Sequence, residues 1–114
     1  MTAVDATIDY GPENVGALVG SNIQLKCRFH HRSCKDMTWT SIGQSGISSL
    51  LYANNAMYQV HGGRYSVNVS VSGECTLHIS RVELSDAGTF SCVEVIAGAK
   101  EQPIKTATAT VVGM

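Results

Sequence analysis

Cys27, Trp39 and Cys92 constrain the fold of this chain more than any other residues. Two distant cysteines with a single tryptophan between them are typical of a small sandwich of two β-sheets. In such a sandwich one cysteine lies on an early strand and its partner on a late strand of the other sheet, with the indole packed against the disulfide. A bridge that closes so long a loop stabilises the fold by roughly 4 kcal/mol in the chain-entropy model.

Length and composition predict one disulfide-bonded domain over residues 1–114. The chain has 114 residues, a net charge of −1 and 15% charged residues, which predicts no basic surface for nucleic acid. Its four cysteines favour an oxidising compartment and allow three pairings. No secretory leader follows Met1, and no apolar run is long enough to span a membrane. We therefore expect an extracellular fragment, the ectodomain of a cell-surface protein or part of a secreted one.

Apolar and polar residues alternate along most of the chain, which predicts an all-β domain of about nine strands without helices. The clearest run, residues 23–29, places Cys27 on the inward face and Arg28 on the outward one. Gly11-Pro12 breaks the first run, so residues 1–11 are expected to hold only a loosely attached edge strand. The expected strands cover residues 2–10, 23–29, 37–40, 49–52, 56–60, 64–71, 75–80, 89–96 and 104–112.

A motif near the end of the chain extends the cysteine and tryptophan pattern. Residues 86–92 are Asp-Ala-Gly-Thr-Phe-Ser-Cys. With Cys27 and Trp39 at their spacings, nearly the whole chain resembles a variable-type (V-set) domain of the immunoglobulin superfamily. The stretch between Trp39 and Arg64 has room for two additional strands, which favours the variable type over the shorter constant type. The resemblance implies an immunoglobulin-like sandwich, a fold that by itself does not specify a function.

The resemblance also implies a salt bridge between Arg64 and Asp86 that closes the bottom of the sandwich; the alternative is that Arg64 is a solvated edge charge. Phe90 stands where the family usually carries tyrosine. Its ring can still fill the core beside Trp39, but the hydroxyl that would bond back to the backbone is missing. We expect an intact corner that is held less tightly.

The last strand departs from the antigen-receptor pattern. Rearranging receptor domains end in a Phe-Gly-x-Gly bulge, whereas residues 101–106 are Glu-Gln-Pro-Ile-Lys-Thr. This favours a non-rearranging recognition domain, similar to the membrane-distal domains of nectin-like, junctional-adhesion and nephrin-like molecules.

The V-set arrangement brings Cys34 and Cys75 to the same end of the sandwich, which implies a second disulfide. Such a bridge would either make the loop before Cys34 rigid for binding or simply staple the fold. A third possibility is that Cys34 pairs with a second chain. Zinc held by Cys27, His30, His31 and Cys34 is disfavoured, because Cys27 is needed for the bridge to the last cysteine. We expect no metal and no cofactor.

V-set domains commonly pair through the face that the family calls GFCC′, formed here by residues 104–112, 89–96, 37–40 and 49–52. Strand parity turns outward Thr38 and Thr40, and Ser91, Val93 and Val95. Leu50 or Tyr52 should join them, and both are included in the predicted partner-binding face. A mildly apolar patch with little charge suits protein contact, although exposed valines also reflect β propensity alone. Sialic-acid-binding members carry an arginine among these positions, which argues against sialic acid but leaves other glycans open. Glu94 has inward parity and is expected near the open loop end.

Asn68-Val69-Ser70 is an N-glycosylation sequon, and Asn68 has the parity opposite to its flanking valines, which predicts an exposed side chain. For catalysis, no nucleophile, base, carboxylate pair or phosphate loop occurs with a usable spacing, so the sequence predicts no enzyme.

The sequence predicts an extracellular recognition or adhesion module that pairs with another immunoglobulin-like domain or with its own copy as a two-fold homodimer. The alternative is an antigen-receptor-like or innate-immune variable domain that binds ligand through residues 28–36, 53–57 and 97–103.

Overall fold

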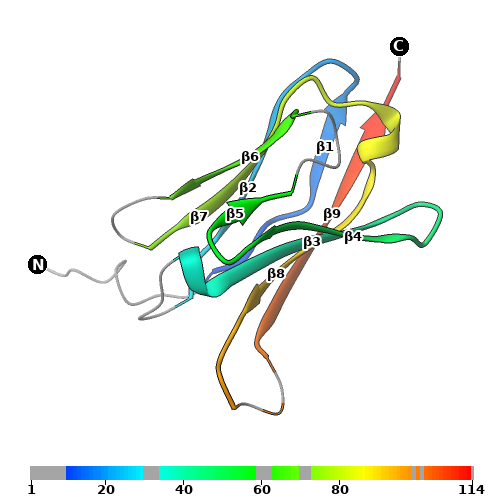
Figure 1. Ribbon diagram of the computed structural model, residues 1–114. Helices are drawn as coiled ribbons and strands as arrows, with labels where there is room; N and C mark the ends of the chain where they lie inside the picture. The colour runs from blue at the N-terminus through cyan, green and yellow to red at the C-terminus, as the bar shows by residue number, and fades with distance from the viewer. Residues whose placement is uncertain are drawn as a thin grey trace, which may run out of the picture.

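The computed structural model describes residues 10–29, 34–58, 63–69, 73–98, 100 and 102–113. They form nine β-strands and two short 3-10 turns, arranged as two sheets packed face to face (Figure 1). The predicted all-β sandwich is therefore confirmed. No helix in this part of the chain is long and apolar enough to cross a membrane.

The larger sheet has six strands in the order β1-β9-β8-β3-β4-β5. β1 runs parallel to β9, and the other neighbouring pairs are antiparallel. β4 and β5 are the two additional strands that the length of chain after Trp39 predicts. The bounds are Val15–Leu18 for β1, Met37–Gly43 for β3, Ser48–Ala53 for β4, Ala56–Met57 for β5, Gly88–Glu94 for β8 and Ile104–Val112 for β9.

The smaller sheet has three antiparallel strands in the order β2-β7-β6. Their bounds are Ile23–Cys27 for β2, Tyr65–Val69 for β6 and Cys75–Ile79 for β7. The two 3-10 turns cover Cys34–Asp36 before β3 and Leu84–Asp86 before β8.

The core lies between the two sheets and follows the alternation of the strands. On β2 the inward residues Ile23, Leu25 and Cys27 are buried while the two between them are exposed. Trp39 on β3 is fully buried, and Phe90 on β8 is buried with its ring centroid 6.4 Å from that of Tyr65 on the opposite sheet. These side chains close the space between the sheets.

Several details differ from the predicted strands or cannot be compared with them. β1 is not among the predicted strands, and β3 extends to Gly43 rather than ending at residue 40. β8 ends at Glu94 rather than at Ile96, and the backbone of Ile96 bonds to the side chain of Gln102 across the hairpin. Arg28 is buried rather than exposed; its backbone pairs with Tyr10 in an isolated bridge. Residues 2–9, 59–60 and 70–71 of the predicted strands lie outside the described residues.

Candidate protein-binding face

One surface of the six-stranded sheet points away from the core, and we call it the outer face. Cross-strand partners lie on the same side of a sheet, so the strand register defines its rows. The central rows are Ile104-Val93-Thr38, Thr106-Ser91-Thr40-Leu50 and Thr108-Thr89-Ile42-Ser48. The outer face thus runs across β9, β8, β3 and β4.

The chemistry of these rows is uniform. None of the described side chains in them carries a charge. The largest apolar members are well exposed: Ile104 at 59%, Ile42 at 45% and Leu50 at 39%. Between them lie hydroxyls, of which those of Ser91 and Thr106 are 3.2 Å apart. The surface therefore combines accessible hydrocarbon with small groups that can donate or accept hydrogen bonds.

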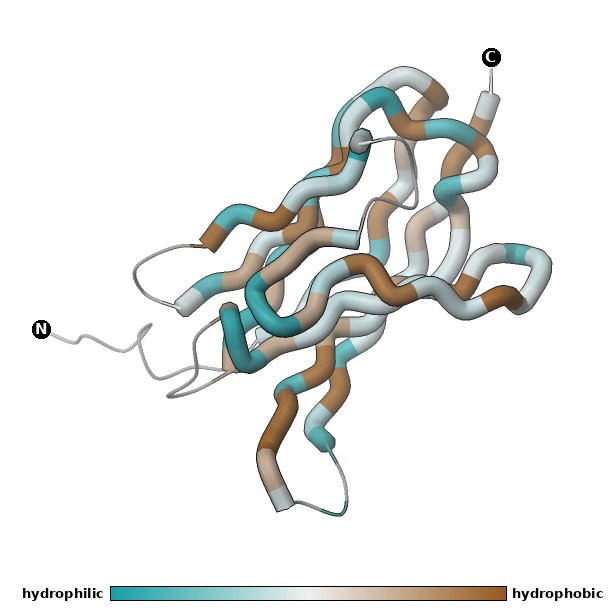
Figure 2. Tube along the Cα trace, viewed as in Figure 1, coloured by the Kyte–Doolittle hydropathy of each residue, from teal (hydrophilic) through white to brown (hydrophobic). Residues whose placement is uncertain are grey.

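The structure brings most of the predicted face residues together. Thr38, Thr40 and Val93 are half-buried and Leu50 is exposed, all within the rows. Val95 lies just past the end of β8 and is also exposed. Its N–H donates to the carbonyl of residue 36 at 2.8 Å, so this segment stays alongside the residues that precede β3. Hydrophobic residues are visible on both strands of this β8–β9 hairpin (Figure 2).

The prediction missed Ile42 and Ile104, although both carry the same parity signal as the residues it found. Ile42 follows Thr38 and Thr40 at the next outward position, and Ile104 is the direct partner of Val93. β3 continues to Gly43, beyond the predicted end at residue 40, and the predicted face includes no residue of the last strand.

Tyr52 corrects the prediction, because it does not lie on the outer face. A bulge shifts the register between β3 and β4, so that Thr40 faces Leu50 while Trp39 faces Tyr52. Both Leu51 and Tyr52 are consequently buried. The Tyr52 hydroxyl donates to Oδ1 of Asn55 at 3.0 Å, and burial raises its pKa.

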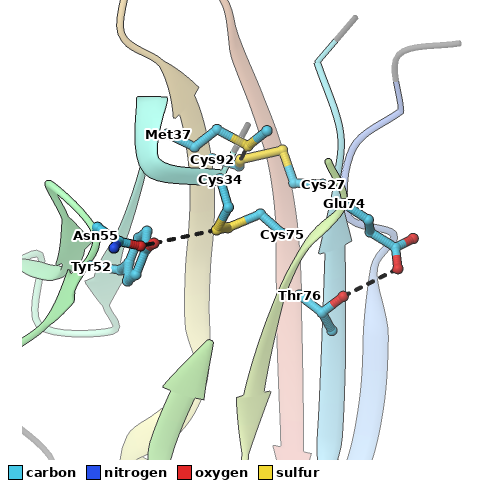
Figure 3. Close-up of a disulfide and its surroundings, with 9 residues drawn as sticks. All are labelled: Cys27, Cys34, Met37, Tyr52, Asn55, Glu74, Cys75, Thr76 and Cys92. Carbon is cyan, nitrogen blue, oxygen red and sulfur yellow. Dashed lines mark hydrogen bonds between the residues drawn. A yellow bond between two sulfur atoms is a disulfide. The ribbon is translucent and has the colours of Figure 1, made fainter. Parts of the chain in front are cut away.

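Two disulfides lie side by side behind this sheet, Cys27–Cys92 and Cys34–Cys75 (Figure 3). Cys27 and Cys75 are direct cross-strand partners on β2 and β7, so both bridges start from the three-stranded sheet. One bridge ends at Cys92 on β8, and the other ends at Cys34 in the 3-10 turn before β3. The Tyr52 hydroxyl lies 3.4 Å from Sγ of Cys34. Because Cys34 forms a disulfide with Cys75, it is bonded within this chain and does not pair with a cysteine of a second chain.

A four-donor site holds the carboxylate at the corner before β8. Arg64 donates to Oδ2 of Asp86 at 2.6 Å and to Oδ1 at 3.0 Å. The Tyr65 hydroxyl donates to Oδ1 at 2.6 Å, and the backbone N–H of Glu83 donates to Oδ2 at 2.7 Å. The predicted ion pair is present, and Arg64 is therefore not a solvated edge charge.

This geometry accounts for the acidity of the site. Burial alone raises the pKa of Asp86, but the hydrogen bonds from Arg64, Glu83 and Tyr65 outweigh it and hold that pKa below its usual value. Burial and the bond to Asp86 raise the pKa of Tyr65. Tyr65 thus brings a buried hydroxyl to this corner from a strand of the opposite sheet, and that hydroxyl bonds to the Asp86 carboxylate rather than to the backbone.

Two remaining predicted residues have definite places. Asn68 is exposed on β6, on the sheet opposite the outer face. Glu94 is buried, as its parity predicts.

The described residues contain no cluster of three or more His, Cys, Asp or Glu that could hold a metal ion. Cys27 and Cys34 are both in disulfides, so the thiolates that zinc would need are taken. His30 and His31, and parts of the loops 28–36 and 97–103, lie outside the described residues.

Comparison with known proteins points to one family. The family model of the immunoglobulin V-set domain matches residues 10–112. No curated protein matches the sequence significantly. The match covers every strand of both sheets.

Proposed function

The chain belongs to the immunoglobulin V-set family, and from that premise we propose that it is an extracellular recognition or adhesion module that pairs through its outer face with another immunoglobulin-like domain. Domains of this family typically mediate recognition and adhesion. The finer statements, the face used and the kind of partner, rest on the chemistry of the surface.

The observation that carries the proposal is the absence of charge across the described rows of the outer face. Removing a charged group from water costs far more than removing a hydroxyl that regains a hydrogen bond. The centres of protein interfaces are accordingly depleted of charged residues. A sheet face with exposed Ile42, Leu50 and Ile104 among threonines meets that requirement.

The same reasoning favours a partner surface of matching character. A partner that brought charges onto this face would lose their hydration and find no opposite charge there. A copy of this face brings none, and its isoleucines and leucine offer hydrocarbon to cover. Pairing of two copies would be isologous, with a two-fold axis.

The extracellular location is supported by the two disulfides, because such bonds form and persist in oxidising compartments.

Sedimentation velocity over a wide concentration range tests the pairing. We expect reversible dimers whose dissociation constant changes little with salt, because no exposed ion pair contributes. Leu50→Arg and Ile104→Arg should abolish association, since each places a charge in the buried contact without touching the core. Both positions are more exposed than the half-buried Val93, so a charge there tests the contact with less disturbance of the fold than a charge at Val93 would.

Ser66→Arg is the matched control, because Ser66 is exposed on β6 of the other sheet. It should dimerise like the parent protein. A parent protein that stays monomeric at high concentration contradicts pairing with its own copy. A dimer that persists in Leu50→Arg but is lost in Ser66→Arg would place the contact on the wrong sheet for this proposal.

A further inference from the structure

The outer surface of the three-stranded sheet differs in chemistry from the outer face. Its rows are Lys26-Thr76-Asn68 and Gln24-His78-Ser66, which are all hydrophilic. Asn68 lies at the end of the first row, on the edge strand β6, and its side chain is exposed. It also begins Asn68-Val69-Ser70, the only Asn-x-Ser/Thr sequence with a non-proline middle residue in the chain.

We propose that Asn68 carries an N-linked glycan, which covers the edge and outer surface of the three-stranded sheet and leaves the outer face of the six-stranded sheet open. The modification site stands on Asn68 alone. The division of labour between the two sheets rests on the proposed function.

The Asn68 amide is placed for modification. The Asn68 side chain is exposed and makes no hydrogen bond to another described residue, so attaching a sugar at its nitrogen breaks none of the hydrogen bonds in that part of the chain. Its neighbours in the row are Thr76, which is buried, and Lys26, which is exposed, so the accessible part of this row is polar. A glycan on this side leaves the rows of Ile42, Leu50 and Ile104 uncovered.

The edge itself gives the modification a physical role. An edge strand exposes unpaired backbone groups that can pair with another chain, and proteins usually protect such edges with charges, prolines or short strands. β6, Tyr-Ser-Val-Asn-Val, has no charge and no proline, and Val69 is 55% exposed. β5, an edge of the larger sheet, is only two residues long. β2, the other edge of the three-stranded sheet, is equally long but carries Lys26. A bulky, solubilising glycan on β6 would block pairing at its uncharged edge.

The reaction needs a donor of stated class, an oligosaccharide linked to a lipid through pyrophosphate. The Asn68 amide nitrogen forms a bond to the anomeric carbon of the first sugar, and the bond from that carbon to the pyrophosphate oxygen breaks. The amide loses one proton, and the lipid pyrophosphate leaves. No electron transfer is involved.

The test is secretion of the whole chain from mammalian cells behind a cleavable leader, as the parent and as Ser70→Ala and Ser70→Thr. Ser70→Thr keeps the sequon, whereas Ser70→Ala removes it without changing Asn68. We expect the parent and Ser70→Thr to migrate more slowly than Ser70→Ala. Peptide N-glycosidase should abolish that difference and leave a carboxylate at position 68, which peptide mass spectrometry detects.

Secreted parent protein that co-migrates with Ser70→Ala and carries an unmodified Asn68 peptide would overturn the modification site. Sedimentation of the glycosylated parent tests the second half. Association equal to that of the deglycosylated protein supports an open outer face, and association that appears only after deglycosylation contradicts it. Because the glycan is measured by mass and pairing by sedimentation, failure of either is recognised separately.

Discussion

Replacing Tyr65 by phenylalanine tests whether its hydroxyl stabilises the corner in place of the one that Phe90 lacks. The change removes a 2.6 Å hydrogen bond to Oδ1 of Asp86 and leaves the ring in the core. Buried hydrogen bonds to charged groups contribute about 1.5–3 kcal/mol. Oδ1 keeps its bond from Arg64, so the carboxylate is not stranded and the lower half of that range applies. We expect a loss of about 2 kcal/mol, or about 8 °C in Tm for a domain of this size.

Urea unfolding at several pH values measures the effect, with Tyr58→Phe as the control because Tyr58 is exposed. The pKa of Asp86 is lowered in the folded state, so its contribution is complete above its unfolded pKa, about 3.9, and is lost as pH falls through the folded value. Tyr65→Phe raises that folded pKa. The difference between variant and parent should therefore shrink in acid. Equal stability at pH 7, or a difference that does not change down to pH about 2, would refute the reasoning.

Other predictions concern the backbone and the second disulfide. A Cβ at Gly88 would collide with a carbonyl oxygen of β3, and the residue has a φ of 155°, so Gly88→Ala should lower the free energy of unfolding by about 3 kcal/mol. Gly43→Ala, with open space around the new methyl group, should change it little by the same urea titration. Replacing both Cys34 and Cys75 by serine opens a loop within the larger disulfide loop and should cost about 3–4 kcal/mol by guanidinium unfolding, while a cost near zero would contradict the loop-entropy argument.

Strand parity was enough to predict most of the outer face, because β3 and β8 alternate regularly from Met37 and from Phe90. It failed on β4, where a bulge places Leu51 and Tyr52 on the same inward side. A bulge depends on how two strands meet, and nothing in the four residues Ser-Leu-Leu-Tyr signals it. Leu50 and Tyr52 have the same parity in the sequence, so only the observed register shows that the first lies outward and the second is buried.

The corner before β8 shows a second limit of sequence reasoning. Because Phe90 lacks the hydroxyl of the tyrosine that the family usually carries, the sequence predicts a corner that is held less tightly. Tyr65 lies on another strand in the opposite sheet, and its contact with Asp86 depends on how the sheets pack. Local patterns predict which residues are buried, but not which distant partner satisfies a buried carboxylate.

The contacts that stabilise the sandwich and the residues proposed to bind a partner are separate. The thermal stability and the dissociation constant should therefore respond to different substitutions. The disulfides and the Asp86 site lie within or at the end of the core, whereas Leu50 and Ile104 contribute no buried contact to it. A sheet held by such contacts needs little ordering on association, which favours affinity. Leu50→Arg should therefore abolish pairing with a Tm within about 2 °C of the parent. Tyr65→Phe should lower Tm and leave the dissociation constant at 20 °C unchanged. If Tyr65→Phe weakened pairing as much as Leu50→Arg does, the outer face would depend on the Asp86 corner. Fold stability and partner binding would then be coupled.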